Sequence, residues 1–239
     1  MPGRAPEARR PPQGYELATF LLAFGALISI VNPLSGAFIF FGATLGIDEK
    51  IRKQVSRWVS IYAFCIVAAS LYIGAYVLSF FGISIPVLRV AGGVIVAMSG
   101  WRMLNEPDAT EQRRSEAPNP HWSLVSPSRL AFYPLTMPLT TGPGTISVAI
   151  SIGASRPHGF HASTFEFFLE TLAAVTLLAL LIYVSYRHSA RLADFIGATG
   201  TSIIVRLSAF LLFCIGIQIL WNGASELLGT LPLGSAGAN

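Results

Sequence analysis

The chain has 239 residues, of which 53% are hydrophobic and only 12% are charged. Soluble domains carry about 25% charged residues, so this composition excludes an ordinary soluble protein and predicts an all-α, polytopic membrane protein. A transmembrane β-barrel is excluded too, because its strands alternate apolar and polar residues, whereas the apolar runs here are continuous. The net charge of +4 does not indicate nucleic-acid binding, because the basic residues flank the apolar runs and fit membrane topology better.

Six long apolar segments predict six transmembrane helices. Each approaches or exceeds the ~20 residues that cross a hydrocarbon core about 30 Å thick. In chain order, the predicted spans are residues 17–42, 55–80, 86–104, 130–154, 166–186 and 202–228. They fall into two groups of three, separated by the longest connection.

The connecting and terminal segments complete the predicted organisation. Residues 15–104 and 129–230 are expected to form two three-helix repeats, and the polar residues 105–128 between them a cytoplasmic loop. Residues 1–14 are rich in proline, arginine and glycine, so we expect a disordered N-terminal arm. Residues 231–239 are expected to form a flexible C-terminal tail.

The distribution of lysine and arginine predicts the orientation in the membrane. The loops after the first, third and fifth spans, with their flanks, hold ten of these residues, against four or five on the opposite side. Because cytoplasmic loops carry an excess of lysine and arginine, the odd-numbered loops are expected in the cytoplasm. Both termini would then lie in the periplasm of a bacterial cell, and the protein would be a multi-pass protein of the inner membrane.

Two of the predicted spans contain residues that interrupt a helix. The first span holds residues 32–36 (Asn-Pro-Leu-Ser-Gly), and the fourth holds three prolines and two glycines within residues 134–144. Proline lacks an N–H donor and clashes with the carbonyl four residues before it. In a bilayer such broken backbone is tolerated only where it is buried in protein or lines a polar cavity. We therefore expect the two breaks to face each other and form the working site; the alternative is a pair of kinks packed by neighbouring helices.

The two halves of the chain also resemble each other. The break at residues 32–36 parallels residues 137–142, and an arginine opens both the third span and the sixth span, Arg89 and Arg206. Since each half has an odd number of spans, the second half must insert upside down relative to the first. Inverted repeats with interrupted helices at matching positions are typical of transporters and indicate the binding site. Chance similarity between apolar helices is the alternative.

The residues at the breaks offer polar groups without a full side-chain charge. Asn32 lies about halfway along the first span, and its amide provides donors and acceptors. Helix N-termini attract a carboxylate, whereas helix C-termini and free carbonyls attract an ammonium group or Na⁺. Such a site suits both ends of a small zwitterion. The candidate substrate-binding residues are Asn32, Pro33, Ser35, Gly36, Pro138, Thr140, Thr141, Gly142, Pro143 and Gly144.

Few ionisable residues fall inside the spans. Arg89, Glu170 and Arg206 are candidates for gating or ion coupling, and the alternative is that they lie at the membrane interface. The neighbouring glycines Gly92 and Gly93 are expected to allow close helix packing.

The other reactive residue types indicate neither a metal nor a cofactor. All four histidines lie in loops or at span ends, and the two cysteines, Cys65 and Cys214, are expected to be small buried hydrophobes. Neither a nucleophile–base arrangement nor a phosphate-binding motif is visible, so we expect no enzyme and no cofactor. Coupling to Na⁺ or H⁺ is left open.

Three stretches together resemble the MarC family of integral membrane proteins. They are residues 32–34 (Asn-Pro-Leu), residues 89–93 (Arg-Val-Ala-Gly-Gly) and residues 138–147 (Pro-Leu-Thr-Thr-Gly-Pro-Gly-Thr-Ile-Ser), and the likeness covers nearly all of residues 17–228. The family is grouped with proteins proposed to transport neutral amino acids. The resemblance therefore implies a six-span membrane protein that moves small solutes.

The expected function is secondary transport or export of a small neutral solute, such as the amino acids glycine and alanine. One half of the protein would rock against the other within the lipid bilayer, and the oligomeric state is left open. Two other functions remain: a channel-like pore, and a non-transporting protein that regulates or organises a membrane partner. An enzyme embedded in the membrane is disfavoured, because no acid–base or nucleophile arrangement lies at membrane depth.

Overall fold

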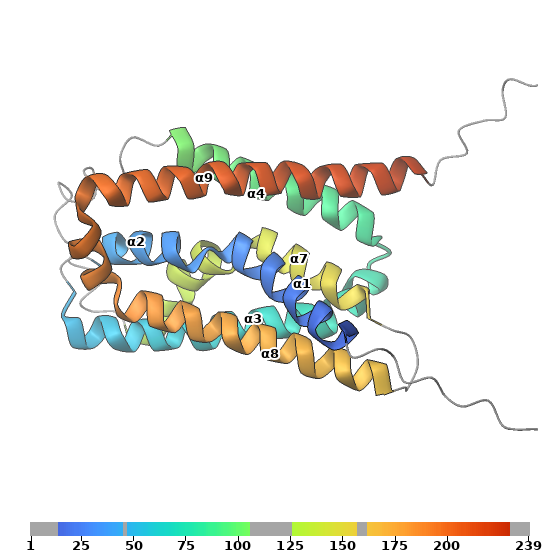
Figure 1. The fold of residues 1–239 in the computed structure, drawn as a ribbon, viewed down its shortest axis with the longest axis horizontal. Helices are drawn as coiled ribbons and strands as arrows, with labels where there is room; N and C mark the ends of the chain where they lie inside the picture. The colour runs from blue at the N-terminus through green and yellow to red at the C-terminus, as the bar shows by residue number, and fades with distance from the viewer. Residues whose placement is uncertain (1–13, 45–46, 106–125, 157–161, 230–239) are drawn as a thin grey trace, which may run out of the picture.

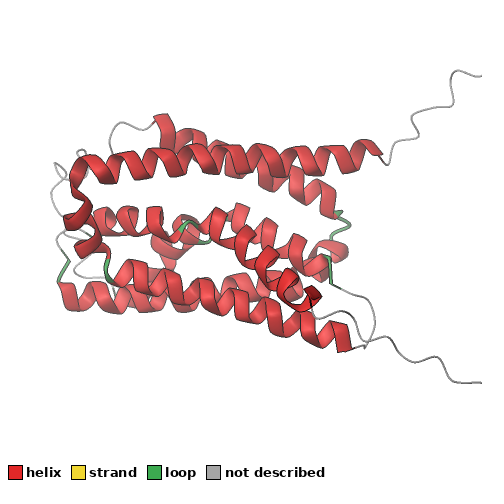
Figure 2. Cartoon of the chain, viewed as in Figure 1, coloured by secondary structure: helices red, strands yellow, loops and turns green. Residues whose placement is uncertain are grey.

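The computed structural model describes residues 14–44, 47–105, 126–156 and 162–229. Over these ranges the chain is helical and contains no strand (Figure 1; Figure 2). Five helices are long and apolar enough to cross a membrane, in agreement with the predicted all-helical polytopic fold. The predicted arm, cytoplasmic loop and tail lie almost entirely outside the described residues.

The first predicted span is broken where the sequence indicates. Helix α1 covers Gly14–Val31 and helix α2 covers Pro33–Ala43. Between them Asn32 takes a left-handed conformation, with φ 43° and ψ 70°, which asparagine tolerates better than most residues. The two helices together still provide one candidate membrane span, Ala18–Ala43.

The fourth predicted span is broken, as its prolines predict, but it does not count as a membrane span: among the described residues there are five candidate spans where the sequence predicts six. Residues 127–154 form a short helix α6 (Pro127–Leu130), a wide helical segment η2 (Ala131–Thr140) and helix α7 (Pro143–Ala154). The backbone leaves helical geometry at Tyr133 and Met137 inside η2. Helix α7 has 12 residues, about 18 Å of helix, which is too short to cross a bilayer core alone. Closely spaced prolines are the physical reason, since each removes a helical hydrogen bond.

The helices form three layers. Figure 1 shows α4 (Ile85–Asn105) and α9 (Ser189–Gly229) along one side, and α3 (Glu49–Phe80) and α8 (Ala162–Arg187) along the opposite side. The interrupted helices α1, α2 and α7 lie between these two layers (Figure 1). Each layer therefore combines a helix from the first half of the chain with one from the second half.

Helix α9 consists of two helical stretches joined at Gly197. This residue has φ 74° and ψ 173°, a conformation that only glycine adopts readily. The chain therefore bends near the start of α9, as Figure 1 shows. The candidate membrane span begins after the bend and covers Thr199–Gly229.

Buried apolar side chains form one core cluster. Its members come from α1, α2, α3, α6, η2, α7 and α8, and none of the described members comes from α4 or α9. Tyr186, Phe40 and Leu27 are among its largest fully buried side chains. Lipid tails are as apolar as leucine, so in a bilayer such a core stabilises the fold through close packing rather than through exclusion of water.

Helices α4 and α9 are packed through glycines instead. A Cβ atom added at Gly93 would collide with the backbone of Leu220, and one added at Gly100 would collide with the backbone of Phe213. Because residue numbers rise along α4 as they fall along α9, the two helices are antiparallel. Gly92 gives α7 similar room, so the predicted packing role of Gly92 and Gly93 is confirmed.

Candidate functional site at the two helix breaks

The first break exposes backbone and side-chain polar groups in the middle layer. Asn32 is half-buried, and its side-chain oxygen accepts a hydrogen bond of 3.3 Å from the backbone N–H of Ser35. Asn32 N–H donates to the carbonyl of Ile28 at 2.9 Å. Pro33 has no N–H to give to the carbonyl of Ser29, one turn before it. Asn32 therefore caps α2, while the proline leaves one carbonyl at the break without its helical donor.

Ser35 is the least satisfied polar group at this break. Its side chain is buried, with 3% of its surface exposed, and among the described residues its hydroxyl has no hydrogen-bond partner. An unsatisfied buried polar group costs about 1–3 kcal/mol, so native proteins keep few of them. The hydroxyl in the first turn of α2 is thus buried with its hydrogen-bonding capacity unused among the described residues.

At the second break the threonine hydroxyls bond to their own segment. Thr140 Oγ1 donates to the carbonyl of Leu135 at 2.7 Å, and Thr141 Oγ1 donates to the carbonyl of Thr136 at 3.3 Å. Each hydroxyl has one proton, so Thr140 and Thr141 keep only acceptor capacity. Helix α7 then begins at Pro143 with Gly142 as its N-cap, and that cap lacks a side-chain hydrogen bond.

The two breaks are built alike, but the proline that corresponds to Pro33 is not the one that the comparison of the two halves in sequence indicates. Pro33 is the first residue of α2, and Pro143 is the first residue of α7. The structural counterpart of Pro33 is therefore Pro143, whereas Pro138 lies inside η2. Proline suits the first helical position because its missing N–H would have no partner there anyway.

The structure also brings the two breaks together. Helix α2 packs against η2, and α1 packs against α7. In Figure 1, α2 and α7 start in the middle of the molecule and run toward opposite ends. Both helix N-termini, each with a partial positive charge, thus point into the middle layer. Of the other predicted residues, Gly36 and Gly144 are buried beside Tyr186 and Val96 respectively.

Tyr186 is a residue that sequence reasoning missed, and it touches both breaks. Its hydroxyl lies 2.9 Å from Thr140 Oγ1, and a Cβ atom added at Gly36 would collide with the same hydroxyl. Its ring stacks on Phe40 of α2 with the centroids 4.7 Å apart. Because Thr140 gives its proton to Leu135, Tyr186 must donate in this pair. A fully buried tyrosine needs a hydrogen-bond partner, but no spacing in the sequence identifies which one.

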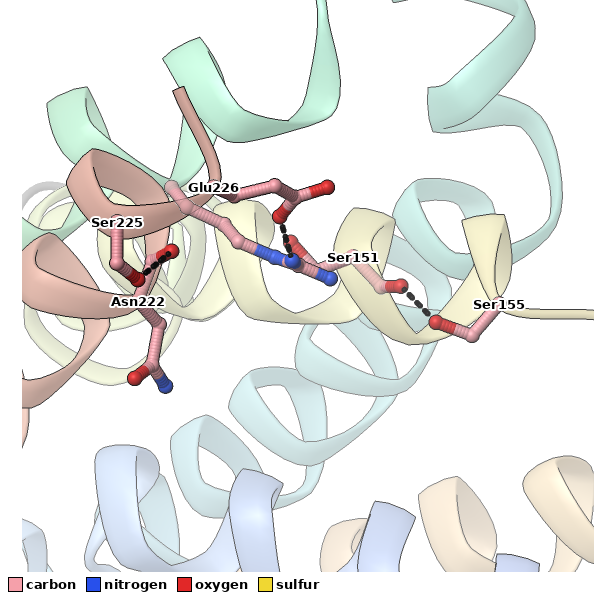
Figure 3. Close-up of polar contacts among 6 residues, drawn as sticks. Ser151, Ser155, Asn222, Ser225 and Glu226 are labelled. Atoms are coloured by element: carbon pink, nitrogen blue, oxygen red, sulfur yellow. Dashed lines mark hydrogen bonds and ion pairs between the residues drawn. The ribbon is translucent and has the colours of Figure 1, made fainter. Parts of the chain in front are cut away.

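The three ionisable candidates do not gather at the breaks. Arg89 of α4 forms an ion pair with Glu226 of α9, a partner that the sequence did not indicate (Figure 3). Glu170 of α8 is half-buried, and among the described residues its Oε2 atom is buried and has no hydrogen-bond partner. Arg206 is an exposed residue of α9.

Polar groups accompany this ion pair at the ends of α7 and α9. Ser155 Oγ donates to the carbonyl of Ser151 at 3.1 Å, and Ser225 Oγ donates to the carbonyl of Asn222 at 3.0 Å (Figure 3). These hydrogen bonds remain within their own helices, so they complete the helix ends and do not form a second site.

The cysteines differ from expectation, because Cys65 and Cys214 are both exposed and free. The prediction that they are buried is wrong, since helix surfaces in a bilayer can present apolar side chains to lipid. In the part of the chain that the structure describes, no three histidine, cysteine, aspartate or glutamate residues cluster as metal ligands. The single described histidine, His188, is exposed, and the other three lie outside the described residues.

Comparison with known proteins gives a family for the chain. The model of "MarC family integral membrane protein" matches residues 17–228. The "UPF0056 inner membrane protein MarC" of Salmonella paratyphi A is 34% identical over 210 residues, which are 87% of this chain and 95% of the relative. The proteins of that name from Citrobacter koseri and Escherichia coli O139:H28 are each 33% identical over the same shares. No solved structure matches the chain. The broken helices and the matched residues lead to one conclusion: the chain belongs to the MarC family of integral membrane proteins.

Proposed function

We propose that this protein is a secondary transporter or exporter of a small neutral solute, and that the solute is a neutral amino acid such as glycine or alanine. One observation carries the proposal. Two helix N-termini point into the middle layer at two breaks, where Ser35, Asn32 and Gly142 offer polar groups without a charged side chain. Interrupted helices of this kind form the binding sites of many transporters.

The carboxylate of such a solute would bind at the start of α2. A negative charge at a helix N-terminus gains about 0.3–1 kcal/mol, and up to about 2 kcal/mol where it is partly buried. The Ser35 hydroxyl would donate to the same carboxylate and so acquire the partner that it lacks among the described residues. A hydrogen bond to a charged group is worth about 1.5–3 kcal/mol.

The ammonium group would bind to oxygen atoms at the same level. The Ser29 carbonyl lacks the donor that Pro33 cannot supply, and Thr140 keeps acceptor capacity because its proton goes to Leu135. Neutral oxygen ligands suit an ammonium group or Na⁺. A solute with an additional net charge would leave that charge unpaired, so the site favours neutral amino acids.

The arrangement of the helices supports an inverted repeat. Each half of the chain contributes one interrupted segment to the middle layer, and the helices α2 and α7 that follow the breaks run in opposite directions. We propose that residues 15–104 and 129–230 are the two repeats and that Arg89, Glu170 and Arg206 contribute to gating or ion coupling.

The proposal places the protein in the inner membrane of a bacterium, with both termini in the periplasm. The names of the relatives as inner membrane proteins support this location, and the excess of lysine and arginine in the odd-numbered loops supports this orientation. The proposed transport needs no cofactor, nucleic acid or enzymatic reaction. Whether it is coupled to Na⁺ or H⁺ is tested by the gradients imposed in the assay below.

The test is uptake of radiolabelled glycine and alanine by proteoliposomes that contain the purified protein, with and without a Na⁺ or H⁺ gradient. We expect saturable uptake, and we expect Ser35→Ala to raise the KM by about tenfold or more because it removes a hydrogen bond to a charged group. Asn32→Gly keeps the left-handed backbone but removes the amide. The matched control is Ser99→Ala, which removes an exposed serine whose hydroxyl donates to the carbonyl of Ile95 in its own helix.

The same assay separates the alternatives. Flux that neither saturates nor shows counterflow identifies a channel-like pore. An inserted, folded protein without flux that retains a second protein through purification identifies a regulator or organiser of that partner. Uptake unchanged in both Ser35→Ala and Asn32→Gly would place the binding site elsewhere.

A further inference from the structure

We propose that α4 and the membrane-spanning part of α9 move as one rigid unit against the rest of the protein. This unit, residues 85–105 and 199–229, is called the α4–α9 pair. The rest, comprising α1, α2, α3, α6, η2, α7 and α8 with residues 189–196, is called the core body. The purpose of the motion rests on the proposed transport function, because the pair covers one side of the layer that holds the breaks (Figure 1).

In the described residues, the buried apolar core lies within the core body. The cluster of buried apolar side chains joins every helix of the core body, and no described member belongs to the pair. Leu192, in the first stretch of α9, packs against that cluster. The boundary between the two units therefore falls inside α9, between Leu192 and the start of the membrane span at Thr199.

Inside the α4–α9 pair the two helix backbones are in direct contact. Gly93 and Gly100 of α4 lie about two turns apart, and each receives the backbone of α9. Gly216 and Gly223 of α9 have the same spacing, and each receives the backbone of α4. Backbone-to-backbone contact leaves no flexible side chain to rearrange, so the two helices hold one fixed geometry. The ion pair between Glu226 and α4 joins the same two helices.

Two glycines with positive φ lie where the pair joins the core body. Gly197 has φ 74° and joins the core-body part of α9 to its membrane span, and Gly82 has φ 68° and joins α3 to α4. Neither has an atom that an added Cβ would meet within 4 Å. The conformation of Gly82 completes the hydrogen-bonded end of α3, since Ile83 N–H donates to Leu78 and Gly82 N–H donates to Ser79. Gly197 is thus the freer joint.

The interface between the two units is compatible with sliding. On α7, Gly144 lies against Val96 of α4, and Ser147 lies against Gly92. A hydrogen bond also crosses the interface, from Ser147 Oγ to the carbonyl of Leu88 at 3.1 Å. At these two points a valine or a serine side chain fills the space beside a glycine, whereas the core cluster is filled by larger side chains such as phenylalanine and leucine. Helix α9 also contacts α2. This division differs from the expected rocking of one repeat against the other, because each unit contains helices from both repeats.

The test measures distances between spin labels by double electron–electron resonance, with the protein in liposomes. The chain's own cysteines report the motion, since Cys65 lies on α3 and Cys214 on α9, and both are exposed and free. Two controls measure distances inside one unit. The first labels Cys214 and Val87→Cys, both in the α4–α9 pair, and replaces Cys65 by alanine. The second labels Cys65 and Leu169→Cys, both in the core body, and replaces Cys214 by alanine. Val87 and Leu169 are 45% and 60% exposed.

We expect two resolved distance maxima for Cys65–Cys214 and one narrow maximum for each control pair. A single Cys65–Cys214 maximum as narrow as the controls overturns the proposal, and so does a Cys214–Val87→Cys distribution with two maxima. The measurement needs no solute. Failure of the motion is therefore distinguishable from failure of the proposed substrate, which only uptake can reveal.

A matched pair of substitutions tests the joint. Gly197→Ala disfavours the backbone conformation of this structure, so it should change the ratio of the two Cys65–Cys214 maxima by about tenfold. Gly25→Ala also adds a methyl group where an added Cβ meets nothing within 4 Å, but its backbone φ is ordinary, and it should leave the ratio unchanged. A ratio that responds equally to both substitutions, or to neither, removes Gly197 as the joint.

Discussion

In the core body most helix contacts are made by large side chains, with one glycine, Gly153 of α7, against the backbone of α3. In the α4–α9 pair, glycines of both helices receive the backbone of the other helix. The core fills its interior with residues such as Phe40, Leu178 and Tyr186. The pair brings backbones into contact through Gly93 and Gly100. Because water supplies no driving force inside a bilayer, both are ways of maximising close packing. We expect lost volume to damage mainly the core body, whose interior is filled by large side chains, and added volume to damage mainly the contact between α4 and α9.

The largest effect is expected from two engineered disulfides, each of which ties α7 to a different neighbouring helix. Val96→Cys with Gly144→Cys ties α7 to α4, across the interface between the units; the added Cβ lies 3.4 Å from Val96 Cβ. Gly74→Cys with Ile150→Cys ties α7 to α3 inside the core body, with a corresponding distance of 3.3 Å. Both distances are close to the roughly 3.5–4.5 Å of a disulfide.

If the units move during transport, oxidation of the first pair should abolish amino-acid uptake and reduction should restore it. Oxidation of the second pair should leave uptake largely intact, because that contact does not change. Both variants need a background in which Cys65 and Cys214 are replaced by alanine. Equal loss of uptake in both oxidised variants would mean that α7 itself must move and that the division into two units is incorrect.

A larger side chain at the contact between α4 and α9 should destabilise the protein. Gly100→Leu should lower the free energy of unfolding by about 3 kcal/mol, the upper part of the usual range for overpacking, because an added Cβ would lie 2.5 Å from the backbone nitrogen of Phe213. Backbone cannot rotate away as a side chain can. Unfolding by SDS in mixed micelles measures the effect, and Gly25→Leu is the control, since space is open there. Similar losses in both variants would show that the glycine contact is not what holds the pair.

A smaller side chain in the core cluster should also destabilise the protein, by a smaller amount. Leu178→Ala should cost about 2 kcal/mol, the lower end of the range for buried leucine, because in lipid only the lost packing counts. Leu180→Ala, on the same helix, is the control, because Leu180 is 54% exposed and Leu178 only 1%. The same unfolding assay measures both variants. If Leu180→Ala costs as much as Leu178→Ala, hydrophobicity rather than packing sets the stability of α8.

The sequence carried enough information for the fold class and for the first break. Apolar runs of sufficient length identify membrane helices, and an asparagine before a proline both ends one helix and caps the next. The second break was located in the correct segment, but the sequence comparison paired Pro33 with Pro138, whereas Pro143 begins α7. The segment holds three prolines, and the sequence alone does not say which of them begins the next helix. Likewise, the division of the fourth span into pieces follows from proline density, which predicts interruption but not where helical geometry resumes.

What the sequence could not provide is contact between distant residues. Glu226 and Tyr186 lie in separate segments from their partners Arg89 and Thr140, and no local pattern relates them. The exposure of Cys65 depends on which face of α3 meets lipid. A helix that is apolar all round does not reveal that face, since its lipid-facing and protein-facing residues have the same character.

The smallest effect on the free energy of unfolding is expected where a hydrogen bond in the core is removed and the packing is kept. Tyr186→Phe should keep the ring stacked on Phe40 but remove the hydroxyl that donates to Thr140. A neutral hydrogen bond is worth about 1 kcal/mol, so the loss of unfolding free energy should be about that size. Tyr183→Phe, one turn earlier on α8, is the control, because its hydroxyl accepts a hydrogen bond from Arg187, an exposed residue.

Transport distinguishes two roles for Tyr186. If its hydroxyl only stabilises the fold, Tyr186→Phe should lower stability without changing the KM for glycine or alanine. If it positions the two breaks relative to each other, the KM should rise several-fold at a temperature where the variant is fully folded, because Gly36 and Thr140 lie on opposite breaks and meet at this one hydroxyl. We expect the second result, since a residue that contacts both breaks fixes the distance between the helix N-termini that would bind the solute.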